Sequence, residues 1–98
     1  MADIELLVDG MLSGTGIRDA LNGGYIKPDK LGLSNQLSER LVQWLAKYEE
    51  AHFFDYKDNT KIKELDAEGI RIARALKSEV PNAYVGYFSS AEMKRSAI

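Results

Sequence analysis

The sequence predicts an α+β domain: two main amphipathic helices packed on a small sheet formed by an N-terminal and a C-terminal strand. Two long segments carry apolar residues at three- and four-residue steps, the spacing of one helix face. Pro81 ends the second segment, because proline cannot continue a helix. Apolar runs of strand length lie near both ends of the chain.

The two apolar runs, residues 4–8 and 84–88, are expected to pair with each other. The first run alternates as a strand does, but apolar residues up to Leu12 also fit helical spacing, so both assignments stay open for residues 4–12. A strand is preferred, because the C-terminal strand needs a partner for its backbone polar groups. Direct pairing would be parallel, since helices separate the two strands.

The remaining segments are expected to be turns, links and one short helix. Residues 13–16 form a glycine-rich turn, from which Thr15 can cap a short helix through residues 17–21. Residues 25–32 are expected to form an irregular link. Residues 90–98 are expected to be frayed.

The two long helices are expected over residues 34–50 and 59–79, the first capped by Ser34 and the second by Asn59 or Thr60. Their buried faces are Leu37, Leu41, Trp44, Leu45 and Tyr48 in the first, and Ile62, Leu65, Ile72, Ala73, Leu76 and Val80 in the second. Gly69 lies on the second of these faces. Because glycine inside a helix costs about 1 kcal/mol relative to alanine, we expect close approach of another element, such as the helix that carries Trp44.

Length and composition limit the functions open to this chain. Its 98 residues, with 45% hydrophobic and 29% charged residues, form one domain, residues 1–98. It has no apolar run long enough to span a membrane, and its first residues lack the basic region of a secretory signal. Cysteine is absent, and the formal charge is −2. We therefore expect a cytoplasmic protein with no membrane or nucleic-acid partner.

The sequence predicts no cofactor and no metal site. Residues 14–16 lack the third glycine and the βαβ unit of a dinucleotide site, and residues 55–59 lack the central glycine and closing glutamate of a calcium loop. His52 is the only histidine, and nothing around it has the spacing of zinc ligands. A general base formed by His52 with Glu49 or Asp55 is the catalytic alternative, although no nucleophile motif accompanies it.

An aromatic, acidic segment between the two helices is the predicted partner-binding site. Its residues are Glu49, Glu50, Phe53, Phe54, Asp55, Tyr56 and Asp58. Aromatic anchors ringed by charge are typical of protein interfaces. The structural alternative is that one phenylalanine closes the end of the core. We expect one of Phe53 and Phe54 to be buried, and the other, with Tyr56, to be partly exposed.

Several motifs between residues 24 and 88 occur together. They are Ile26-Lys27-Pro28-Asp29, Leu31-Gly32-Leu33-Ser34, Leu37, Arg40-Leu41, Trp44, Leu65-Asp66-Ala67-Glu68-Gly69, Ala73, Leu76 and Tyr84-Val85-Gly86-Tyr87-Phe88. This combination resembles small bacterial proteins associated with polymorphic toxin systems, among which are candidate immunity proteins. The motifs are structural and include no catalytic residue.

The resemblance implies a non-enzymatic protein that binds and neutralises a bacterial toxin through a protein interface. An acidic face would suit a toxin that is basic because it handles nucleic acid. Two alternatives stay open. One is a small enzyme or ligand-binding domain that uses His52 with nearby carboxylates. The other is an adaptor or oligomeric subunit whose open sheet edge pairs with another chain.

Overall fold

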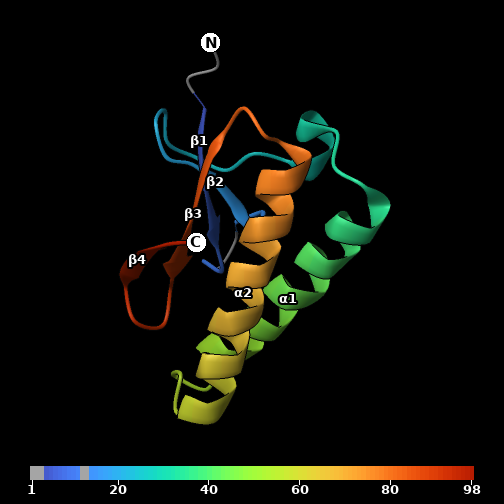
Figure 1. Ribbon diagram of the computed structural model, residues 1–98. Coiled ribbons are helices and arrows are strands. Elements are labelled where there is room, and N and C mark those ends of the chain that lie inside the picture. Colours follow the sequence, from blue (N-terminus) through green and yellow to red (C-terminus); the bar gives the residue numbers. More distant parts are fainter. Residues whose placement is uncertain (1–3, 12–13) are drawn as a thin grey trace.

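A four-stranded sheet carries both long helices on one of its faces (Figure 1). The computed structural model describes residues 4–11 and 14–98. The elements along the chain are β1 (Glu5–Asp9), β2 (Ile17–Asp19), a 3-10 helix (Pro28–Leu31), α1 (Asn35–Phe53), α2 (Asn59–Glu79), β3 (Tyr84–Ser89) and β4 (Lys94–Ala97). This arrangement confirms the predicted α+β fold. Within the described part of the chain, none of the helices combines the length and apolar character that a membrane span requires.

The strands β1 and β3 pair in parallel in the middle of the sheet, whose strand order is β2-β1-β3-β4. Their register runs from Glu5 opposite Tyr84 to Asp9 opposite Phe88. The strand assignment for residues 4–8 and the parallel pairing are both confirmed. Leu12, which extended the competing helical pattern, lies outside the described residues.

The short helix predicted through residues 17–21 is wrong, because Ile17–Asp19 forms the strand β2, antiparallel to β1. The expected cap residue has a different role: the hydroxyl of Thr15 donates to the carbonyl oxygen of Ile26 at 2.6 Å. Ile17 pairs with Val8 and is 1% exposed. Burial beside β1 therefore outweighs the weak local helical pattern.

The prediction of a frayed tail is also wrong, because Lys94–Ala97 forms the strand β4, antiparallel to β3. Met93, with φ of 54°, ends the connection between the two strands. The side chain of Arg95 then forms an ion pair with Glu5 of β1. These four residues carry little apolar character of their own, so their pairing depends on the edge that β3 offers.

Both long helices form where the periodicity predicts them, and side-chain caps hold their starts. Ser34 caps α1, because its Oγ accepts the backbone N–H three residues on, at 3.2 Å. The helix α1 runs past the predicted end at residue 50 to Phe53. The helix α2 has the predicted bounds, but Asp58 caps it instead of Asn59 or Thr60.

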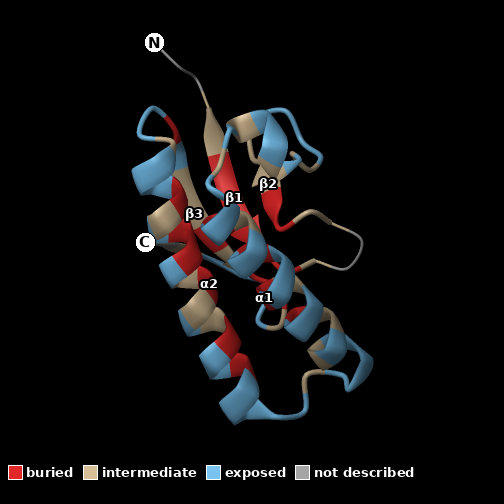
Figure 2. Cartoon of the chain, turned by 90° about the vertical axis from the view of Figure 1, so that its right-hand side faces the viewer, coloured by how far each residue is buried: buried red, intermediate tan, exposed pale blue. Residues whose placement is uncertain are grey.

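The core lies between the helix pair and the sheet (Figure 2), and Trp44 is its largest fully buried side chain. The Trp44 ring is 2% exposed, and its Nε1 donates to the carbonyl oxygen of Leu65 at 2.8 Å. The close approach predicted at Gly69 is confirmed. A Cβ there would lie 2.9 Å from a Trp44 ring atom and 2.2 Å from the ring of Tyr87. Gly69 therefore lets α2 approach both α1 and β3.

Asp66 of α2 gathers hydroxyl donors from α1 and β3. Tyr48 and Tyr87 donate to its Oδ1 at 2.7 and 2.6 Å, and Ser89 donates to its Oδ2 at 2.8 Å. Burial, together with the bond to Asp66, raises the pKa of Tyr48 to about 12 and raises the pKa of Tyr87 well above its ordinary value. Three elements are thus joined through hydroxyls that must keep their protons to donate.

This network predicts a loss of stability at alkaline pH. The folded chain holds the Tyr48 proton more tightly than the unfolded chain, whose tyrosines have a pKa near 10. The contribution of Tyr48 to the free energy of unfolding is therefore fully present below about pH 10 and is lost as the pH rises toward about 12. Urea unfolding at several pH values should show a shallower fall for Tyr48→Phe. Tyr84→Phe, which removes an exposed hydroxyl, is the control; equal slopes for Tyr48→Phe and wild type would contradict the assignment.

Candidate functional site

The turn between α1 and α2 uses a backbone conformation that residues other than glycine rarely adopt. Asp55 and Tyr56 both have φ of 55°, in the left-handed region that costs roughly 1–2 kcal/mol for an L-residue. Their backbone N–H groups donate to the carbonyl oxygens of His52 and Ala51, at 3.0 Å each. The chain therefore reverses between the helices within residues 54–58 and sends neighbouring side chains in different directions.

The two phenylalanines at this turn both face solvent. Phe53 is 76% exposed and Phe54 is 66% exposed, so the prediction that one of them is buried is wrong. The left-handed turn directs Tyr56 back onto the helices, where its ring packs against Tyr48 with centroids 6.1 Å apart. Tyr56 is partly buried and packs against the core, and this burial raises its pKa. It thus occupies the place expected for a phenylalanine.

The acids predicted for the site surround these aromatic residues. Glu50, Asp55 and Asp58 are exposed, and Glu49 is half-buried. Asp58 also has a structural role, because its side chain accepts the backbone N–H of Lys61 at 3.1 Å as the α2 cap. We call the seven predicted residues, Glu49, Glu50, Phe53, Phe54, Asp55, Tyr56 and Asp58, the aromatic turn. The structure brings all of them to one end of the helix pair.

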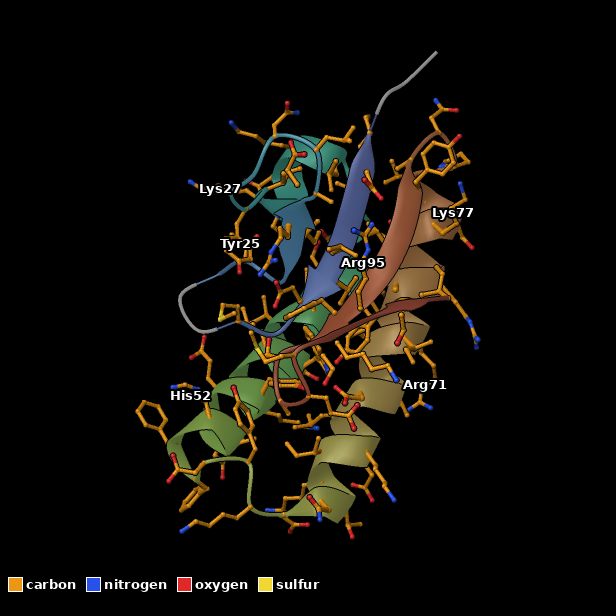
Figure 3. All side chains as sticks on the ribbon, turned by 90° about the vertical axis from the view of Figure 1, so that its left-hand side faces the viewer. Tyr25, Lys27, His52, Arg71, Lys77 and Arg95 are labelled. Carbon is orange, nitrogen blue, oxygen red and sulfur yellow. The ribbon has the colours of Figure 1, made fainter. Side chains whose placement is uncertain are left out.

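His52 lies in the last turn of α1, although the predicted helix end at residue 50 would place it in the connection between the two helices. It is exposed at the surface (Figure 3), and its Nδ1 lies 3.1 Å from the hydroxyl oxygen of Tyr56. Its ring also contacts those of Phe53 and Tyr56 edge-on. Among the described residues, its side chain hydrogen-bonds to Tyr56 and to no carboxylate, and no group of three metal-ligating side chains occurs. The contacts of His52 therefore support the turn.

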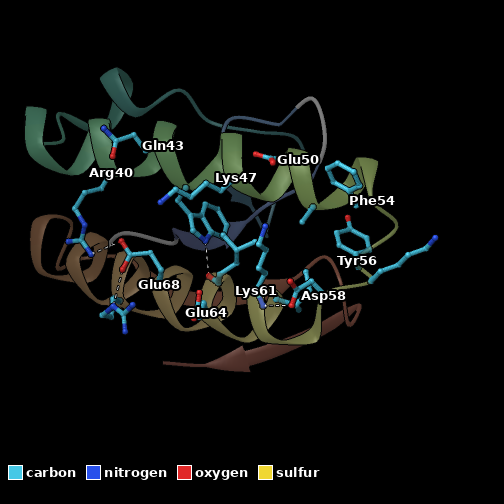
Figure 4. Close-up of a pocket in the computed structure, with 16 residues that line it drawn as sticks. Arg40, Gln43, Lys47, Glu50, Phe54, Tyr56, Asp58, Lys61, Glu64 and Glu68 are labelled. Carbon is cyan, nitrogen blue, oxygen red and sulfur yellow. Dashed lines mark hydrogen bonds and ion pairs between the residues drawn. The ribbon is translucent and has the colours of Figure 1, made fainter.

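A groove of about 890 Å³ runs between α1 and α2 and reaches the aromatic turn (Figure 4). Its apolar lining is Trp44, Ala51, Phe54, Ile62 and Leu65, and its polar lining is Arg40, Gln43, Lys47, Glu50, Tyr56, Lys57, Asp58, Lys61, Glu64, Glu68 and Arg71. The groove was not predicted from the sequence. Periodicity identifies the exposed residues that border the buried face of each helix, but only the packing of α1 against α2 shows that these two sets of residues lie opposite each other.

The end of the groove away from the turn holds an ion cluster. Glu68 accepts from Nε of Arg71 at 2.9 Å and from Nη2 of Arg40 at 3.3 Å (Figure 4). Burial alone would raise the pKa of Glu68, but the hydrogen bonds from Arg71 and Arg40 lower it. One carboxylate thus faces two guanidinium groups, which leaves an excess of positive charge at this end.

Comparison with known families identifies the chain. A family model described as Serratia CdiI immunity protein-like matches residues 3–90, which include β1 through β3 and both helices. Neither a curated protein nor a solved structure matches the chain. The family match confirms the resemblance to toxin-associated immunity proteins, and a protein of this kind binds a cognate toxin protein. The chain belongs to the Serratia CdiI immunity protein-like family, and it is a toxin-neutralising immunity protein.

Proposed function

We propose that the protein neutralises its toxin by binding alone, without an enzymatic activity, and that the toxin contacts the aromatic turn. The observation that carries this proposal is the exposure of both Phe53 and Phe54, two consecutive residues, beside a left-handed turn. The absence of cysteine supports a cytoplasmic, reducing location.

This proposal explains why Asp55 and Tyr56 adopt a strained, left-handed backbone conformation. Backbone strain persists where the surroundings impose it, and it concentrates at functional sites. Here Tyr56 anchors the turn through its contacts with Tyr48 and His52. The two phenylalanines, which contribute little to the core, then present apolar area to a partner. A preformed backbone turn loses little conformational entropy on binding.

The acids around the rings support a basic partner surface. Glu49, Glu50, Asp55 and Asp58 stand against the single cation Lys57 in this segment. Charges at the rim of an interface mainly accelerate encounter with a surface of opposite sign. A toxin that handles nucleic acid carries such a basic surface.

Replacing both phenylalanines with alanine should weaken toxin binding by about 2 kcal/mol or more, or roughly 30-fold in Kd, mostly through faster dissociation. Both side chains are exposed, so the fold should be retained. Val42→Ala is the matched control, because Val42 is 64% exposed on the same helix and lies away from the turn. Binding kinetics with the purified cognate toxin measure the difference. Equal dissociation rates for the double variant and the control would remove the aromatic turn from the interface.

Reversing the charges of Glu49 and Glu50 to lysine should slow association by about tenfold at low salt and weaken its salt dependence, with little change in dissociation. We choose these two acids because Asp58 caps α2 and Asp55 has positive φ. The control is Glu39→Lys, an exposed acid in the first part of α1. If Glu39→Lys slows association as much as the double variant, net charge and not the aromatic turn determines the rate.

Binding and catalysis also differ in stoichiometry. A protein that acts by occlusion neutralises one toxin molecule per copy, whereas an enzyme would inactivate a molar excess. Titration of toxin activity should therefore end at an equimolar ratio. His52→Ala removes one of the two contacts that anchor Tyr56 but leaves its packing on Tyr48, so this variant should also reach its end point at an equimolar ratio. Neutralisation of excess toxin, lost in His52→Ala, would instead establish the catalytic alternative.

A further inference from the structure

The groove between α1 and α2 is continuous with the aromatic turn, because Phe54 and Tyr56 line both. From Arg40 to Phe54, the C-cap of α1, the lining spans fourteen residue steps, or about 21 Å at about 1.5 Å per step. Trp44 and Leu65 contribute apolar atoms to the lining between these ends. A partner that covers the exposed phenylalanines can therefore extend into an elongated, partly apolar groove.

The charges along the groove are distributed unevenly. At the end away from the turn, Arg40 and Arg71 stand against Glu68, and the middle of the groove holds one cation, Lys47, and one acid, Glu64. At the turn, Glu50 and Asp58 line the groove with Lys57 and Lys61, and Glu49 and Asp55 of the aromatic turn bring the acids there to four against two cations. One end of the groove is thus basic and the other is acidic. An occupant that matches it must carry the opposite polarity along its length.

The groove walls determine the backbone form of the occupant. Both walls are helices, and their backbone polar groups are already bonded within α1 and α2. An extended segment would find few backbone partners there and would bury unpaired N–H and C=O groups. A helix satisfies its own backbone, and its side-chain ridges fit the furrow between two packed helices.

We propose that the groove receives an amphipathic helix of the cognate toxin, about four turns long, with an acidic end over Arg40 and Arg71 and a basic end at the aromatic turn. This inference rests on the proposed function, because it extends the same toxin contact. It adds the kind of element that the toxin contributes and its direction along the groove.

Single introduced thiols test whether the toxin fills the groove. The chain contains no cysteine, so each introduced thiol reports alone. Gln43→Cys places the thiol on the groove, and Val42→Cys places it on the neighbouring exposed position outside the groove. Adding the purified toxin should slow alkylation of Gln43→Cys by tenfold or more, on the order expected for a buried interface position. Val42→Cys should react at an unchanged rate.

A matched pair of charge reversals tests the direction of the helix. Arg71→Glu changes the basic end of the groove, and Arg74→Glu makes the same change one turn further along α2 and outside the groove. Glu68 keeps Arg40 as a partner in the first variant. Arg71→Glu should weaken toxin binding by about fivefold or more, while Arg74→Glu should leave it within about twofold. Thermal melting of both variants checks their folding.

The outcomes separate this inference from the proposed function. If Phe53→Ala/Phe54→Ala weakens binding but Gln43→Cys stays reactive and Arg71→Glu binds as Arg74→Glu does, the groove is not occupied and the aromatic turn alone is the site. If Gln43→Cys is protected at high protein concentration without toxin, a second copy of this chain fills the groove, and the inference is overturned. Protection of Gln43→Cys only by toxin, together with the effect of Arg71→Glu, supports the toxin helix.

Discussion

Trp44→Ala should lower the free energy of unfolding by about 3–5 kcal/mol, a large part of the stability of a domain of this size. The ring is 2% exposed and packs edge-on against Tyr48 and Tyr87, with centroids 5.4 and 6.0 Å away. Truncation would leave a cavity and would also leave the carbonyl oxygen of Leu65 without the Nε1 donor. Urea unfolding with the wild type as reference measures the loss.

Two controls separate the packing of Trp44 from its hydrogen bond. Trp44→Phe keeps an aromatic ring and removes the donor, so it should cost less than Trp44→Ala. Val42→Ala removes an exposed apolar side chain from the same helix and should cost less than about 0.5 kcal/mol. A loss for Trp44→Ala no larger than that for Val42→Ala would show that Trp44 does not belong to the core. Because Trp44 also lines the groove, toxin binding by its variants is interpretable only after this measurement.

Gly69→Leu should destabilise the fold by about 3 kcal/mol through overpacking. Gly69→Ala, which adds a single methyl group, should also destabilise the fold. The first carbon of any side chain at Gly69 would lie 2.2 Å from a ring atom of Tyr87 and 2.9 Å from a ring atom of Trp44. The side chains would have to move, and Tyr87 is held in place by its bond to Asp66.

The effect of Gly69→Ala on stability should have the opposite sign from that of a glycine-to-alanine change at an exposed helix position. In an exposed helix interior, replacing glycine with alanine stabilises by about 1 kcal/mol. Ala67→Gly, at an exposed position of the same helix, should therefore cost about 1 kcal/mol. If Gly69→Ala instead raises the unfolding midpoint, α2 does not approach β3 and α1 as closely as the structure shows.

The local sequence was sufficient for the elements that bury a continuous face. The helical periodicity around Trp44 and Gly69 predicted both helices, and the apolar strand of residues 84–88 required a buried partner, which identified β1. The same pattern predicted that Gly69 lies at a close contact. It could not identify Tyr87 as the second neighbour, because that contact joins α2 to a strand.

Only the tertiary structure decided the short edge strands, the aromatic turn and the groove. Ile17–Asp19 and Lys94–Ala97 are too short to show a strand period, and they become strands because β1 and β3 offer them backbone partners. Tyr56, and neither phenylalanine, closes the core, because two left-handed residues direct its ring inward. Periodicity shows which face of each helix is buried. Which exposed flanks meet across the groove is determined by how α1 and α2 pack, and that packing depends on contacts between residues far apart in the sequence.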